Sequence, residues 1–445
     1  MTVGTVVMTQ SARWADPARD VRVVIALLPL WWVLGLDQFV WPIAVGLLIV
    51  KAVMARRRIP LPTPFTLGAG VLLFAIVASA TMVSDGRELT YVRNLSVYGA
   101  GLGLAVLTIA THSTLAQVVA TVRVLVITFG LVTFAGALGS LGLWFEFSTP
   151  MARVVGALGP SEYVSTMVNK SFVHAEALWF AEGFLRPRGL MMFPNILGGV
   201  AALSLAAKLL LRAPERPALR VVWFGAALLD AGVIVATLSR STWLAFMVGL
   251  AVVLITSRAT SRERFSRLSL VGLLAGALVV SGGIDIVLER AVERGHSNEI
   301  RLDTYVLTLD AAADSFATML VGHGTQQTAE TLRIPLGSHS TYLGLFFKYG
   351  VLGLVGFSVV LWSGWLRALR MHGRRWCAAQ TGVPAFVLFA ITFFAIQFWF
   401  IEVDVDAAYS VFFWLILSLS FALVRIERSL RGANATEPAR SAEVA

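Results

Sequence analysis

Two arginines lie where apolar runs of the chain begin or end, and a third lies in the polar segment between two runs; a positive charge at such a position needs a partner. Arg188 lies between Pro187 and Gly189 just before one run, Arg240 lies in a polar turn between two others, and Arg301 lies in a long polar segment. An arginine at helix-centre depth in a bilayer costs about 2.5–3.5 kcal/mol on insertion scales. Its planar guanidinium binds phosphate oxygens in pairs. The positions predict an anion site, with a simple snorkelling role as the alternative.

His339 immediately precedes an apolar run that reads GSHSTYLGLFFKYGVLGLVG. A helix beginning there would hold the imidazole at a membrane interface, with Ser338 or Ser340 as its N-cap. Imidazole is the side chain best suited to accept a proton from a hydroxyl near neutral pH. A lone interfacial histidine is more often structural, so both interpretations stay open at this point.

Nearby charges bear on the arginine site. Asp230, within an apolar run, is an alternative structural partner for Arg240. Arg290 and Arg294 share the polar segment of Arg301 and could take its role, but we interpret them as solvated charges on a surface helix.

The remaining reactive residues are few. The chain contains no H-E-x-x-H, Cys–His or paired-carboxylate spacing, so we expect no metal site and no hydrolytic dyad. The single cysteine, Cys377, excludes an internal disulfide. Glu402, Asp404 and Asp406 precede the last apolar run and could bind a cation or an acceptor, but we favour a solvated loop.

The composition defines the elements that must position these residues. Of the 445 residues 57% are hydrophobic and only 14% are charged, and the mean hydropathy is +0.77. A soluble protein of this length could not cover so much apolar surface. We therefore predict an all-α, polytopic integral membrane protein with about twelve transmembrane helices. The predicted spans are 21–36, 39–54, 64–82, 94–110, 115–139, 190–211, 219–237, 242–257, 267–283, 341–364, 382–401 and 408–425.

Two of these boundaries follow from length. The stretch 221–256 carries only Asp230 and Arg240 as charges. As one helix it would be roughly 54 Å long, whereas the hydrocarbon core is about 30 Å thick. It must therefore double back, and the polar residues 238–242 are the place to turn. The same reasoning divides 21–54 at Asp37 and Gln38.

Basic residues gather in the short loops on one side of this alternation, which is the distribution expected of cytoplasmic loops. The net charge of +10 thus reflects orientation, and nucleic-acid binding is not expected. We predict cytoplasmic N- and C-termini, a first run retained as a span, and one membrane domain over 1–431. The tail 432–445 is expected to be disordered. Two long outer loops, near 140–189 and 284–340, are expected to lie on the membrane with short amphipathic helices.

Four stretches resemble a known family in their order along the chain. From His339 the sequence reads H-S-x9-G-x-x-G and ends at Gly350 and Gly353. The others are RPRGLMMFPN at 186–195, ATLSRSTWLAF around Arg240, and RLDTYVLTLDAAADSFATMLVGHGT before the histidine. Together they cover about 186–365 and resemble the O-antigen ligase and polymerase superfamily of envelope glycan transferases.

The resemblance implies a reaction and its partners. Such proteins transfer a glycan from a polyprenyl diphosphate carrier to a hydroxyl of a glycan or glycolipid acceptor, at the outer face of the cytoplasmic membrane. They do so without a metal or nucleotide cofactor. Carried to this chain, the resemblance makes His339 the catalytic base and makes Arg188, Arg240 and Arg301 the diphosphate-binding residues. Tyr305, four positions after Arg301, fits the family pattern. A single in-line displacement would invert the anomeric centre.

Other functions remain open from the sequence. A polymerase would differ from a ligase only in its acceptor, which would be another lipid-linked repeat unit. A transporter of envelope lipids or anions would use the arginines to bind a passing anion. It would be expected to show paired repeats with broken helices in matching halves, and no such symmetry is evident. A structural assembly protein is a further alternative.

Overall fold

The computed structural model describes residues 17–55, 59–143, 146–157, 167–173, 186–257, 295–327, 335–373 and 382–442. The predicted ninth span (267–283) and the two arginines at 290 and 294 lie outside them. In chain order the elements are α1 (Pro17–Ala26), α2 (Leu28–Leu34), α3 (Val40–Met54), α4 (Thr63–Ala78), the 3-10 helix η2 (Ser79–Met82), α5 (Glu88–Thr111), α6 (Leu115–Ser140), β1 (Glu146–Ser148), α7 (Pro150–Gly156), β2 (Asn169–Ser171), α9 (Pro194–Leu210), α10 (Pro217–Ala236), α11 (Arg240–Thr256), α14 (Gly295–Ala312), α15 (Phe316–Val321), α16 (Thr341–His372), α18 (Val383–Gln397) and α19 (Ala407–Ala442).

The described residues form a predominantly helical, multi-pass membrane protein. Six helices are long and apolar enough to cross a bilayer: Thr63–Met82, Glu88–Thr111, Leu115–Ser140, Pro217–Ala236, Thr341–His372 and Ala407–Arg431. Four shorter apolar helices are Val40–Met54, Pro194–Leu210, Arg240–Thr256 and Val383–Gln397. Each of the ten coincides with a predicted span, whereas the total of twelve stays a prediction.

Both predicted division points are turns. α2 ends at Leu34 and α3 begins at Val40, and α10 ends at Ala236 just before α11 begins at Arg240. The first predicted span, 21–36, differs from expectation because it consists of two short helices, α1 and α2. Pro29, at the start of α2, lacks the amide hydrogen that a continuous helix would require.

The interior is built around α19, whose spanning part is almost entirely buried. α5 packs along it, and α6, α16 and α18 also contact it. α4 packs closely on α16 because Gly68 meets Gly356: a Cβ at Gly68 would lie 2.8 Å from the Gly356 carbonyl oxygen. Small residues that allow close backbone approach are the usual basis of helix association in membranes. α19 continues as helix to Ala442.

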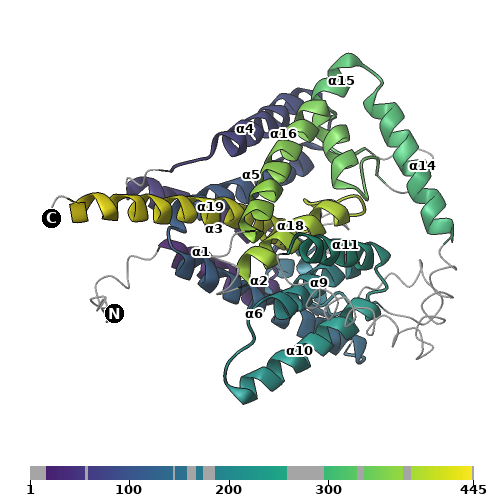
Figure 1. The fold of residues 1–445 in the computed structure, drawn as a ribbon. Helices are drawn as coiled ribbons and strands as arrows, with labels where there is room; N and C mark the ends of the chain where they lie inside the picture. The colour runs from purple at the N-terminus through teal and green to yellow at the C-terminus, as the bar shows by residue number, and fades with distance from the viewer. Residues whose placement is uncertain are drawn as a thin grey trace.

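The two predicted outer loops contain structure of different kinds. In the first, β1 and β2 form an antiparallel pair with Phe147 opposite Lys170, and α7 follows β1. In the second, α14 and α15 occupy the segment where the sequence pattern predicted helix. In Figure 1, α14 lies at the end of the molecule opposite the C-terminal end of α19.

Candidate active site

His339 lies in a tight turn directly before α16. Its backbone has φ of +63°, a left-handed conformation that only a few per cent of non-glycine residues adopt and that costs of the order of 1–3 kcal/mol. Ser340 is the N-cap of α16 and accepts a hydrogen bond from the Leu343 amide at 3.3 Å. Of the two predicted caps, Ser340 is therefore the one used. The strain must be compensated by contacts that hold the turn.

Those contacts come partly from the loop that follows α18. The Thr341 amide donates to the Phe398 carbonyl at 2.7 Å, and the Thr341 hydroxyl donates to the Ile401 carbonyl at 2.6 Å. A net hydrogen bond contributes about 0.5–1.5 kcal/mol. Several such bonds together are of the same order as the strain at His339.

α14 approaches the same turn from another side. The Tyr305 hydroxyl lies 3.2 Å from both the His339 and the Trp399 carbonyl oxygens. The Gly337 amide donates to the Thr308 hydroxyl at 2.9 Å. Arg301 lies one helical turn before Tyr305, and its charge acts on His339. Tyr305, which fits the family pattern four positions after Arg301, is thus part of the structure around the histidine.

α11 brings the second cation. Arg240 is the first residue of α11 and is exposed, and its charge acts on Arg301. The residue two positions earlier, Leu238, also has a positive φ of +48°. The Arg186 guanidinium holds this turn, since its Nε and Nη2 donate to the Thr237 carbonyl at 2.8 and 2.5 Å. The two non-glycine residues with positive φ in the described part of the chain therefore both lie at the candidate site.

The electrostatics of this group favour an anion. Burial, together with the charge of Arg301, lowers the pKa of His339 from 6.5 to about 4. Burial and the charge of Arg240 lower the pKa of Arg301. α11 and α16 begin beside these residues, and helix N-termini carry partial positive charge that favours phosphate. The site thus combines a neutral imidazole with two cations that repel one another.

Arg188 has different surroundings. Its Nε donates to the Ser171 carbonyl at 2.9 Å. Burial lowers its pKa, while the nearby carboxylates of Glu146 and Asp37 oppose that effect. In the structure the charge of Arg240 therefore acts on Arg301, and the charge of Arg301 acts on His339. Arg188 instead lies near carboxylates.

The sequence offered little signal to distinguish Arg186 from Arg188. The two residues flank Pro187, which forms an isolated antiparallel bridge with Val173. Side chains two apart on extended backbone share a face, but the chain turns at Gly189, which has φ of +56°. Only the tertiary structure shows that Arg186 contacts the turn before α11.

The glycines of the H-S-x9-G-x-x-G stretch break α16. Gly350 has φ of +64° within the helix, and a Cβ there would lie 2.2 Å from the Leu320 carbonyl oxygen of α15. The break frees the carbonyls of Phe347 and Lys348, which accept hydrogen bonds from the His323 and Gly324 amides, each at 2.8 Å. In Figure 1, α16 bends near α15. The helix break at this motif therefore allows α16 to bind the segment at His323 and Gly324, which precedes His339 in the chain.

The acidic residues before α19 are not a solvated loop. Asp404 forms a buried ion pair with Lys348 at 2.6 Å, and Glu402 lies 3.4 Å from the same ammonium. Asp406 is buried and accepts hydrogen bonds from the Tyr409 and Met192 amides. These residues hold the loop after α18 that supports His339. In the part of the chain that the structure describes, no group of three or more His, Cys, Asp or Glu side chains could hold a metal.

Asp230 is also paired in a way that the sequence did not reveal. It binds Lys208 of α9 at 2.6 Å in the protein interior. The suggested alternative, in which Asp230 would neutralise Arg240, is therefore replaced by an ion pair between α9 and α10.

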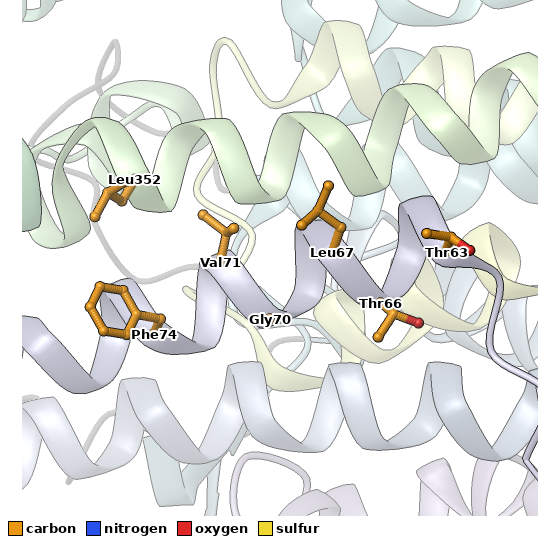
Figure 2. A pocket seen from close by; sticks show the side chains of 7 residues that line it. All are labelled: Thr63, Thr66, Leu67, Gly70, Val71, Phe74 and Leu352. Atoms are coloured by element: carbon orange, nitrogen blue, oxygen red, sulfur yellow. The ribbon is translucent and has the colours of Figure 1, made fainter.

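An apolar groove of about 540 Å³ lies elsewhere, along α4. Figure 2 shows its lining side chains, which come from α4 except for Leu352 of α16. None of the predicted site residues lines it.

The comparison with known protein families matches one part of the chain. Residues 225–358 match the family model described as O-antigen ligase, and this range contains Arg240, Arg301 and His339. No curated protein matches the chain. The resemblance to the O-antigen ligase-like superfamily is thereby confirmed over residues 225–358, in a chain whose apolar helices are those of a multi-pass membrane protein.

Proposed function

We propose that the protein is a ligase-like glycosyltransferase that moves a glycan from a polyprenyl diphosphate to an acceptor hydroxyl at the outer face of the cytoplasmic membrane. The observation that carries this proposal is that the charge of Arg301 in α14 acts on His339 before α16, while the charge of Arg240, at the start of α11, acts on Arg301. A proton acceptor and an anion site are the two features that such a transfer requires.

Each step can be assigned to a group of the chain. The acceptor oxygen attacks the anomeric carbon of the donor sugar, and the bond from that carbon to the diphosphate oxygen breaks. The acceptor proton passes to the imidazole of His339. Arg240 and Arg301 stabilise the negative charge that develops on the leaving diphosphate. One displacement of this kind inverts the anomeric centre, and no further reactant is consumed.

The charge around His339 suggests that the donor itself makes the base effective. Burial and the charge of Arg301 disfavour the imidazolium and lower the pKa of His339 to about 4. A diphosphate bound to Arg301 would place negative charge beside the ring and raise that pKa, because an opposite charge favours the protonated form. His339 would then be a stronger base with donor bound than without it.

The arrangement of the helices supports an extracytoplasmic site. α14, which carries Arg301 and Tyr305, lies at the end of the molecule opposite the C-terminal end of α19 (Figure 1). If the C-terminus is cytoplasmic, as the basic loops indicate, the site faces the other side of the membrane.

The test uses purified protein in liposomes with a lipid-linked glycan donor and a glycolipid acceptor. We expect His339→Ala to lower the transfer rate by about 10²–10⁴-fold, the usual contribution of a general base. His372→Gln is the matched control, because His372 lies at the far end of α16 and its ring contacts the Val253 carbonyl. This control should transfer at the wild-type rate.

Two outcomes would contradict the proposal. Transfer by His339→Ala at the wild-type rate would exclude the histidine as the base. Movement of the donor across the bilayer without any transferred product would indicate a transporter. Where transfer occurs, the product distinguishes the two enzymes: a ligase extends the glycolipid acceptor, and a polymerase joins lipid-linked units to one another.

A further inference from the structure

The side chains of Arg301, Tyr305 and Thr308 lie four and three positions apart along α14. Residues at this spacing share one face of a helix. Tyr305 contacts the His339 carbonyl, and Thr308 contacts the Gly337 amide. One face of α14 therefore carries a proposed diphosphate ligand together with two contacts that bracket the catalytic turn.

From this juxtaposition we propose that Tyr305 and Thr308 are positioning residues that hold the imidazole of His339 at a fixed position relative to Arg301. The inference rests on the proposed function. In this proposal α14 carries the diphosphate ligand Arg301 and also contacts the turn that contains His339. One rigid helix therefore fixes both the anion site and the base.

The Tyr305 hydroxyl is well placed for this role because it joins three elements. It belongs to α14, and its single hydrogen is shared between the carbonyls of His339, before α16, and Trp399, after α18. The Thr308 hydroxyl is buried, and it donates to the Thr304 carbonyl at 2.6 Å while accepting from Gly337. Its orientation is thereby fixed.

The backbone at the turn explains why such contacts matter. Gly337 and His339 have φ of +77° and +63°, and an L-residue leaves the left-handed region when nothing holds it there. Relaxation of His339 would move its ring relative to Arg301. A misplacement of about 1 Å in a catalytic group can lower a rate about 100-fold.

Tyr305→Phe removes the hydroxyl and keeps the ring. We expect the turnover number to fall by about tenfold to 100-fold, with the donor KM unchanged because Arg301 remains. Thr308→Val should act in the same direction. The matched control is Tyr342→Phe, which removes a hydroxyl from α16 that contacts the Ala395 carbonyl at 2.8 Å and not the His339 turn. Its turnover number should equal that of wild type.

A double-mutant cycle separates positioning from a general structural effect. If Tyr305 acts only through His339, Tyr305→Phe/His339→Ala should be no slower than His339→Ala. A further loss in the double variant of the same size as in Tyr305→Phe alone would overturn this inference and leave the proposed function intact. An active His339→Ala would overturn both.

A measurement without catalysis gives a second test. Two spin labels are attached to cysteines at Leu309 of α14 and Val351 of α16, both exposed positions, after Cys377→Ser removes the native thiol. We expect a narrow distance distribution in wild type and in Tyr342→Phe, and a broader one in Tyr305→Phe. A narrow distribution in Tyr305→Phe would overturn the inference, because α14 would then be held without the hydroxyl.

Discussion

The lysines of the chain and the arginine beside His339 accommodate positive charge in opposite ways. Each of the four lysines binds an aspartate at 2.6 Å, in the pairs Lys51–Asp20, Lys170–Asp37, Lys208–Asp230 and Lys348–Asp404. In the part of the chain that the structure describes, the charges that act on Arg301 include another cation, Arg240, and no carboxylate.

A buried ion costs several kcal/mol unless it is paired, so a lysine with its own aspartate is already neutralised. The comparison therefore favours Lys208 and Lys348 as parts of the scaffold, and it favours Arg301 as a ligand-binding residue.

The largest effect that this comparison predicts comes from removing the cations at the site. Arg301→Ala and Arg240→Ala should each lower the transfer rate by about 10²–10³-fold, the usual cost of one group that stabilises transition-state charge. Rates are measured in the liposome assay. Arg153→Ala, on the exposed surface of α7, is the control and should leave the rate unchanged. If Arg301→Ala transferred at the wild-type rate, the distinction between a ligand-binding arginine and the scaffold lysines would be wrong.

Removing a paired lysine should instead affect stability. Lys208→Met leaves Asp230 buried without its partner, which costs about 3–5 kcal/mol, and the thermal unfolding midpoint in detergent should fall clearly. Lys208→Met/Asp230→Leu should recover most of the loss because no charge is then left buried. The folded fraction of either variant should transfer at the wild-type rate. A double variant no more stable than Lys208→Met would argue against the ion pair.

Much of the scaffold followed from hydropathy alone. The turns near Asp37 and at 238–240 were predictable because a bilayer limits helix length, and the position of His339 directly before α16 followed from its place before an apolar run. These are properties of one segment at a time, which a sequence displays directly.

Pairings between segments were not predictable. Asp230 is 22 positions from Lys208, and Lys348 is 56 positions from Asp404, so no local pattern reports either ion pair. Glu402 and Asp404 were therefore predicted to lie in a solvated loop, although both contact Lys348. The break at Gly350 was missed for a related reason: an isolated glycine in an apolar helix is common in membranes, and only the contact with Leu320 shows why this one is required.

A smaller effect concerns the pH dependence. The charge of Arg301 is one cause of the low pKa of His339, after burial. Arg301→Gln removes a nearby positive charge, so the imidazolium becomes less unfavourable and the pKa of His339 rises. The acid limb of kcat/KM, which reports the free enzyme, should move from near pH 4 to higher pH by about one unit. Arg153→Gln is the control, and a limb that moves to lower pH would contradict the assigned cause.

The smallest effect is expected at the one lysine pair that is exposed. The side chains of Lys51 and Asp20 retain 68% and 32% of their accessible surface, so water already solvates both charges. Such pairs contribute about 0–1 kcal/mol, and salt weakens them further. Lys51→Ala should therefore leave the unfolding midpoint close to that of wild type, with any difference vanishing at high salt. A loss as large as that of Lys208→Met would mean that an aspartate partner, and not burial, determines what a lysine contributes to this protein.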